Sequence, residues 1–95
     1  MYSGKDEAPD AIIRVGDKVK IKNLTWYNQY KNRLKEVETL DGVTFVESMR
    51  GYCGDWGKVT RVWKGYRLHP LFSIDIAIGW TFTPSMIEKV IHNED

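Results

Sequence analysis

The sequence predicts an all-β fold, a small barrel of about five strands with a long first loop and a single helical turn before the last strand. Two observations carry this prediction. Short runs that alternate apolar and polar residues, rich in β-branched and aromatic side chains, recur from Val19 to Ile91. Glycine- and proline-containing turn signals separate most of these runs. A closed or nearly closed sheet also removes edge strands that a free sheet would expose.

The size and composition of the chain limit what it can be. Its 95 residues are enough for one core, and the 42% hydrophobic and 13% aromatic content is ample to fill it. One cysteine excludes an internal disulfide framework and a multi-cysteine zinc site. No apolar run approaches the length of a membrane span, and no signal peptide is evident at the start. We expect a cytoplasmic monomer.

Charge and composition divide the chain into three parts. Residues 1–11 lack apolar periodicity and are expected to form a disordered tail, as are residues 92–95, around a barrel at 12–91. Of the 14 basic and 13 acidic residues, one basic and five acidic ones lie in 1–10 and 93–95. The remaining 13 and 8 leave the body with a charge of about +5, which permits a phosphate-rich partner without requiring one.

The first half of the barrel contains one clear strand and one ambiguous segment. After the Gly16-Asp17 turn signal, Val19 and Ile21 alternate with Lys18, Lys20 and Lys22, as in a half-buried strand. Residues 25–38 form either a helix or a long ordered loop. A helix would begin at Thr25 as the N-cap and place four apolar residues on one face, namely Trp26, Tyr30, Leu34 and Val37. Asp41-Gly42 predicts a turn, and residues 43–49 an extended piece or one helical turn.

The second half has more regular strand signals. Residues 58–63 and 71–78 predict strands, with Phe72, Ile74, Ile76 and Ile78 on one face of the second. Gly79 permits a tight reversal into residues 80–83, where Trp80 and Phe82 face inward and Thr81 and Thr83 outward. Pro84 begins a single helical turn, and residues 89–91 form a last strand. This order of elements is typical of an SH3-like barrel.

Two stretches of the sequence resemble a known family. They are "VGDKVKIK" at 15–22 and "MRGYCGDWGKVTRVW…FSIDIAIGWTFTPSMIEKV" at 49–90. They resemble small SH3-like proteins of an uncharacterised bacterial and phage family, and are distantly similar to the SH3-like repeats of mind bomb ubiquitin ligases and to KOW-type barrels. The resemblance covers residues 12–91 and implies a fold more than a function. The chain has no RING-type cysteines, so ligase activity does not carry over.

The residues do not indicate an enzyme, and we expect no catalytic residue, cofactor or metal. Cys53 would need a histidine base to act as a nucleophile, and neither His69 nor His92 lies in a recognisable motif. The simpler interpretation is that Cys53 is a small structural residue that packs beneath the glycines at 51, 54 and 57. Those glycines do not form a phosphate loop, because they neither follow a strand nor open a helix. The two histidines and the scattered carboxylates lack metal-ligand spacing.

Two sets of side chains suggest binding. The first set consists of aromatic residues expected mostly in loops: Tyr52, Trp56, Tyr66, Trp26 and Tyr30. It predicts a non-catalytic binding module that contacts a protein or peptide. The alternative is a nucleic-acid-binding barrel that uses a basic stripe on the first two strands, formed by Lys18, Lys20, Lys22, Lys58, Arg61 and Lys64. The stripe requires those two strands to be neighbours. The same pattern of lysines would also be found if they served only to keep a small barrel soluble.

Overall fold

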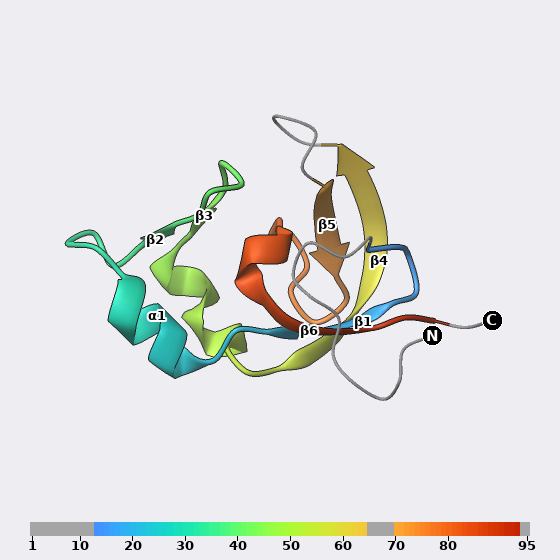
Figure 1. Ribbon diagram of the computed structural model, residues 1–95, viewed down its shortest axis with the longest axis horizontal. Coiled ribbons are helices and arrows are strands. Elements are labelled where there is room, and N and C mark those ends of the chain that lie inside the picture. The colour runs from blue at the N-terminus through green and yellow to red at the C-terminus, as the bar shows by residue number, and fades with distance from the viewer. Residues whose placement is uncertain (1–12, 65–69, 94–95) are drawn as a thin grey trace.

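The computed structural model describes residues 13–64 and 70–93 and is mostly β. A four-stranded antiparallel sheet has the order β5-β4-β1-β6, and β2 and β3 form a separate two-stranded ribbon (Figure 1). The strands of the sheet are β1 (Lys18–Ile21), β4 (Trp56–Lys64), β5 (Pro70–Ile74) and β6 (Ile87–Ile91). The all-β prediction is confirmed at this level. The ladders of the described residues do not show a closed barrel.

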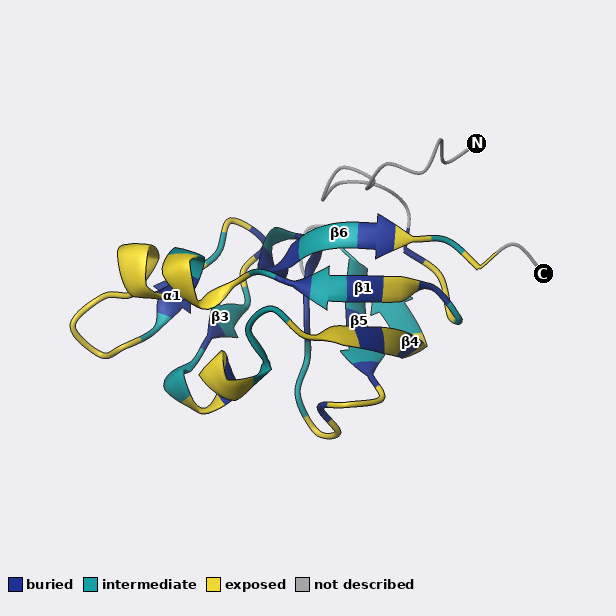
Figure 2. Cartoon of the chain, turned by 90° about the horizontal axis from the view of Figure 1, so that it is seen from below, coloured by how far each residue is buried: buried dark blue, intermediate teal, exposed yellow. Residues whose placement is uncertain are grey.

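The strand β1 follows the predicted alternation. Val19 and Ile21 are fully buried, while Lys18 is exposed (Figure 2). The turn before it has Gly16 at φ +96°, a conformation that glycine adopts without steric cost. Beyond β6, hydrogen bonds continue to Asn93, whose backbone N–H donates to Asp17.

The ambiguous segment is a short helix followed by a loop and a strand. The helix α1 (Leu24–Tyr30) is capped by Asn23, whose Oδ1 accepts the backbone N–H of Trp26 at 2.9 Å. The prediction of Thr25 as the N-cap is therefore wrong. The helix stops because the Asn32 side chain accepts backbone N–H groups of Leu34 and Glu36, which holds the next residues in a turn.

The rest of that segment departs from the predicted helical face. Val37 belongs to β2 (Val37–Glu38), which pairs with β3 (Thr44–Phe45) across the predicted Asp41-Gly42 turn. Leu34 and Tyr30 are exposed, and the buried aromatic residue of α1 is Tyr27. The segment at 43–49 contains both predicted alternatives, because β3 leads into the 3₁₀ helix η1 (Glu47–Tyr52).

The predicted strand at 71–78 is wrong after Ile74. The chain turns at 75–79, so Ala77 points inward, while Ile76 and Ile78 are 38% and 89% exposed. Residues 80–83 form only one bridge, Phe72 to Phe82, and not a strand. Phe82 is buried as predicted, but Thr83 is buried as well. The turn at Pro84 is confirmed as the 3₁₀ helix η3 (Pro84–Met86).

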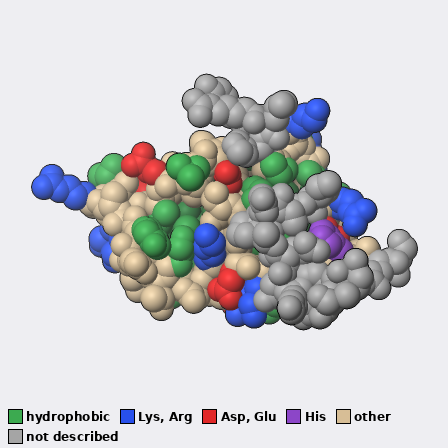
Figure 3. Space-filling view, viewed as in Figure 1, with side chains coloured by type: hydrophobic (Ala, Val, Ile, Leu, Met, Phe, Trp, Pro, Cys, Tyr) green, Lys and Arg blue, Asp and Glu red, His purple; other side chains and the backbone are tan. Residues whose placement is uncertain are grey.

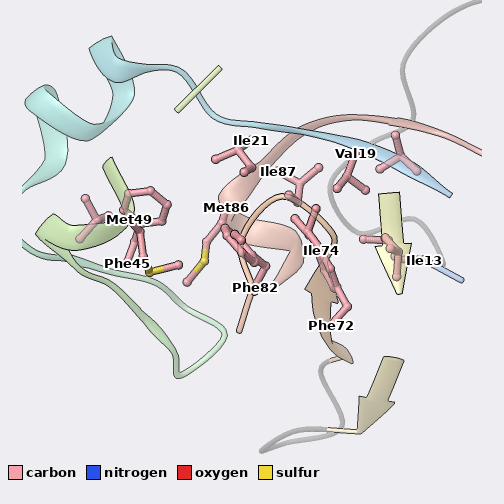
Figure 4. Packing of buried hydrophobic residues seen from close by; sticks show 14 of the residues in the cluster. Ile13, Val19, Ile21, Phe45, Met49, Phe72, Ile74, Phe82, Met86 and Ile87 are labelled. Atoms are coloured by element: carbon pink, nitrogen blue, oxygen red, sulfur yellow. The ribbon is translucent and has the colours of Figure 1, made fainter. Parts of the chain in front are cut away.

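One apolar core joins the sheet to the lobe that contains α1, β2, β3 and η1. In Figure 4, Met86 and Phe82 lie between Phe45 and Met49 on one side and Ile74 and Phe72 on the other. The segment from Phe82 through η3 therefore connects the two halves. The buried hydrophobic residues of the core are Ile13, Val19, Ile21, Tyr27, Val37, Phe45, Met49, Val59, Phe72, Ile74, Ala77, Phe82, Met86, Ile87 and Val90.

Candidate functional site

A groove of about 430 Å³ runs beside α1, and we call it the helix groove. Trp26 and Tyr30 lie four residues apart on α1, so both side chains reach the same face of the helix. In Figure 3, hydrophobic side chains gather over the half of the molecule where α1, β2 and β3 lie, with charged side chains beside them. The groove is lined by Lys22, Trp26, Tyr30, Val37, Glu38, Thr39, Leu40 and Ser85.

The walls of the helix groove combine fixed and exposed apolar groups. The Trp26 ring packs edge-on against the buried Phe45 ring at a centroid distance of 5.2 Å, which fixes its position. Lys22 Nζ lies 5.4 Å from the centroid of the Trp26 ring, a cation–π distance. Tyr30 is 60% exposed and Leu40 is 94% exposed. The groove therefore offers unoccupied apolar surface on a rigid support.

A hydrogen bond links two sides of this groove. The backbone N–H of Ser85, in η3, donates to Oδ2 of Asp41 at 2.9 Å. Asp41 is buried and directly follows Leu40 in the β2–β3 turn. This bond links the β2–β3 turn to η3, and the neighbouring Leu40 and Ser85 itself both line the groove.

Two other predicted aromatic residues, Tyr52 and Trp56, do not line this groove. Tyr52, at the end of η1, is half-buried and packs against the core. Trp56 begins β4 and lines a different hollow. Tyr66 lies outside the described residues. Of the four predicted aromatic residues that the structure describes, Trp26 and Tyr30 share the helix groove, and Tyr52 and Trp56 lie apart from it.

A second, smaller hollow of about 280 Å³ lies on the sheet, and we call it the sheet hollow. Lys18 and Lys58 are directly opposite each other where β1 pairs with β4. The condition for the predicted basic stripe, that the two strands are neighbours, is therefore met. The sheet hollow is lined by Lys18, Trp56, Gly57, Lys58, Asp75 and Ile76.

The remaining members of the predicted basic stripe have other surroundings. Lys20 pairs with Glu88 at 3.7 Å, and Lys22 belongs to the helix groove. The Arg61 guanidinium lies 5.3 Å from the centroid of the Trp63 ring. Lys64 ends β4 and is exposed. Of the predicted basic stripe, Lys18 and Lys58 line the sheet hollow together with Trp56, whereas Lys22 lines the helix groove with Trp26 and Tyr30.

Cys53 has the environment of a packing residue. Its side chain is half-buried and packs against the core. Burial, with a smaller contribution from Asp55, raises the pKa of the Cys53 thiol, which opposes formation of the reactive thiolate. Of the two histidines, His92 is hydrogen-bonded to Asp17, and His69 lies outside the described residues.

The described residues contain neither a cluster of metal ligands nor a membrane-spanning helix. Within 13–64 and 70–93, no three histidine, cysteine, aspartate or glutamate side chains come together as a metal site would require. Among the described residues, no helix has the length and apolar character needed to cross a membrane.

Sequence reasoning missed several residues that line the two hollows. Leu40 lies next to the Asp41-Gly42 turn signal, and an apolar residue beside a turn was the available clue to exposure. Asp75 and Ile76 were placed in a strand, whereas the turn at 75–79 brings them to the sheet hollow. Ser85 reaches the helix groove only through tertiary structure.

Comparisons of the chain with models of protein families, with curated proteins and with solved structures found no match. The resemblance to small SH3-like proteins stays a prediction.

Proposed function

We propose that this chain is a non-catalytic binding module that contacts a protein or peptide through the helix groove. The observation that carries the proposal is the pairing of Trp26 and Tyr30 with the exposed Leu40 around one groove. Apolar surface left exposed beside polar groups is typical of interaction sites. Aromatic side chains on a rigid support are also the residue type that dominates binding energy at interfaces.

The chemistry of the groove favours an extended segment with apolar anchor side chains. Trp26, Tyr30 and Leu40 supply apolar contact area. Lys22 and Glu38 supply one charge of each sign, so a partner can be oriented by polar groups of its own.

We also infer that the sheet is part of an SH3-like barrel. Two features support this assignment. Phe82 bridges Phe72 on the edge of β5 that does not face β4, and η3 then leads directly into β6 at the opposite edge of the sheet. A chain that passes from one edge to the other in this way brings the two edges toward each other.

A peptide-display selection tests the proposed function. Random peptides are selected on the native chain, and individual binders are measured against Tyr30→Ala and Leu40→Ser. Both side chains are exposed, so their removal should not disturb folding. We expect each to weaken binding, with Tyr30→Ala costing about 30-fold, as for a hot-spot residue worth about 2 kcal/mol.

Leu34→Ser is the matched control for that selection. Leu34 is 74% exposed but does not line the groove, so this change should leave peptide affinity unaltered. Peptides that bind the native chain, Tyr30→Ala and Leu40→Ser equally well would show that the helix groove is not the binding site.

A further inference from the structure

Two positive charges face each other in the sheet hollow. Lys18 and Lys58 are directly opposite each other on neighbouring antiparallel strands. Like charges in this position repel each other and destabilise a sheet. Neither lysine has an ion-pair partner in the described part of the chain, whereas the nearby Lys20 pairs with Glu88. An anionic group between the two lysines would remove the repulsion.

An exposed aromatic ring lies beside these charges. Trp56 is 41% exposed and does not belong to the core. It pairs in register with Lys20 and lies two residues before Lys58, on the same outer face of the sheet. Such a ring can stack with any nucleobase, because every base has a π face.

Gly57 lines the hollow between Trp56 and Lys58. It is paired with the buried Val19, and a Cβ added to Gly57 would collide with the Ile74 side chain in the core. Asp75 also lines the hollow, and its Oδ1 accepts the backbone N–H of Lys58 at 2.9 Å. Two lysines against one aspartate leave the hollow with a net positive charge.

We propose that the sheet hollow binds single-stranded nucleic acid, with one base stacked on Trp56 and an adjacent phosphate between Lys18 and Lys58. This site is separate from the helix groove and does not rest on the proposed peptide-binding function. Farther along β4, the Arg61 guanidinium lies over the Trp63 ring, and these two side chains could contact a longer oligonucleotide.

The Trp56 ring favours single-stranded nucleic acid over other polyanions. An acidic peptide would satisfy the two lysines but has no base to stack on Trp56. A duplex offers phosphates at high density, but its bases are already stacked on each other. Only an unpaired strand uses the lysines and the indole together.

Fluorescence anisotropy tests the proposal with labelled oligo(dT) and oligo(U) of about 16 nucleotides, the upper end of known single-strand site sizes. A duplex of equal length and polyglutamate serve as competing polyanions. We expect single strands to bind most tightly. Trp56→Ala should weaken single-strand binding by about tenfold, while Trp56→Phe retains most of it. The oligo(dT) and oligo(U) arms separate DNA from RNA as the preferred strand.

The salt dependence of oligonucleotide affinity gives a second, independent test of the phosphate contact. The double variant Lys18→Gln/Lys58→Gln should reduce the slope of log affinity against log salt by about 0.7, the value for the one phosphate that the two lysines share, and each single variant should weaken binding. Lys31→Gln is the matched control, because Lys31 is exposed at the end of α1, outside the sheet. Tyr30→Ala should not change oligonucleotide binding, so failure of this proposal is distinguishable from failure of the peptide site.

Three results would each overturn the proposal. The first is absence of oligonucleotide binding to the native chain at low salt. The second is binding that Trp56→Ala leaves unchanged, or that polyglutamate matches, which would indicate a general site for polyanions. The third is an equal loss of affinity in Lys31→Gln and Lys18→Gln, which would indicate diffuse attraction. Thermal unfolding of each variant verifies that it is folded.

Discussion

The imidazole Nδ1 of His92 lies 2.9 Å from Oδ2 of Asp17. The Asp17 carboxylate, which is 1% exposed, also accepts backbone N–H groups of Arg14 and Asn93 at 2.8 and 2.9 Å. Asp17 therefore fastens the segment that precedes β1 to the segment that follows β6. The residue was identified from the sequence only as part of a turn.

Asp17→Asn should destabilise the protein in a pH-dependent way. Burial raises the pKa of Asp17, but the hydrogen bonds from Asn93, Arg14 and His92 outweigh it and bring the pKa below its ordinary value. A lowered pKa means that the charged carboxylate stabilises the fold above the ordinary value of about 3.9, and that this contribution is lost as the pH falls through the folded-state pKa. We expect a cost of about 1.5–3 kcal/mol at neutral pH.

Urea unfolding of both proteins from neutral pH down to pH 3 measures this effect. The difference in unfolding free energy between the native chain and Asp17→Asn should be largest at neutral pH and shrink below about pH 4. The other carboxylates are present in both proteins, so the difference reports on Asp17 together with its contact to His92. A difference that stays constant down to pH 3 would contradict the assignment.

Asn23→Ala should destabilise α1, whereas Thr25→Ala should not. The Asn23 side chain satisfies the backbone N–H of Trp26 at the start of the helix, and Thr25 lies inside the first turn. Loss of an N-cap costs about 1 kcal/mol. Thermal unfolding of the two variants compares them directly, and an equal cost for both would contradict the observed cap.

The sequence predicted elements well where one face of a strand is buried. In β1 and in β4 as far as Val59, buried and more exposed side chains alternate, because one face packs on the core and the other meets solvent. The alternation is lost beyond Val59, where the pairing of β4 with β5 shifts register. The prediction of a strand was wrong in the second half of 71–78, where four apolar residues alternate with other residues as in a strand. A turn held by the Ala77 N–H to Ile74 carbonyl bond moves Ile76 and Ile78 to the surface.

The candidate sites depend on contacts that sequence patterns do not encode. Trp26 and Tyr30 were selected as aromatic residues, but the helix groove also needs Leu40 and Ser85, which tertiary packing brings there. Trp56 was assigned to a peptide surface. The register of β1 on β4 places it opposite Lys20, in a hollow that also contains Lys18 and Lys58.

Cys53 should react slowly with alkylating agents. Its side chain is half-buried, and burial together with Asp55 raises the pKa of the thiol, so little thiolate is present at neutral pH. The rate of iodoacetamide modification measured against pH should reach its midpoint above the ordinary cysteine value of about 8.5. Glutathione under the same conditions is the reference. A midpoint below that value would indicate an activated thiol and would contradict the packing role.

Gly57→Ala should be among the most damaging small substitutions in the chain. Gly57 is buried in β4 at an ordinary negative φ, so the requirement for glycine is one of space. The added Cβ would meet the Ile74 side chain, which is itself buried in the core and has little room to move. Overpacking of this kind costs about 1–3 kcal/mol.

Gly51→Ala is the matched control, because a Cβ there meets no atom within 4 Å. Urea unfolding should show a large loss for Gly57→Ala and almost none for Gly51→Ala. Equal stability of the two variants would mean that β4 and β5 are not packed together as closely as the structure has them.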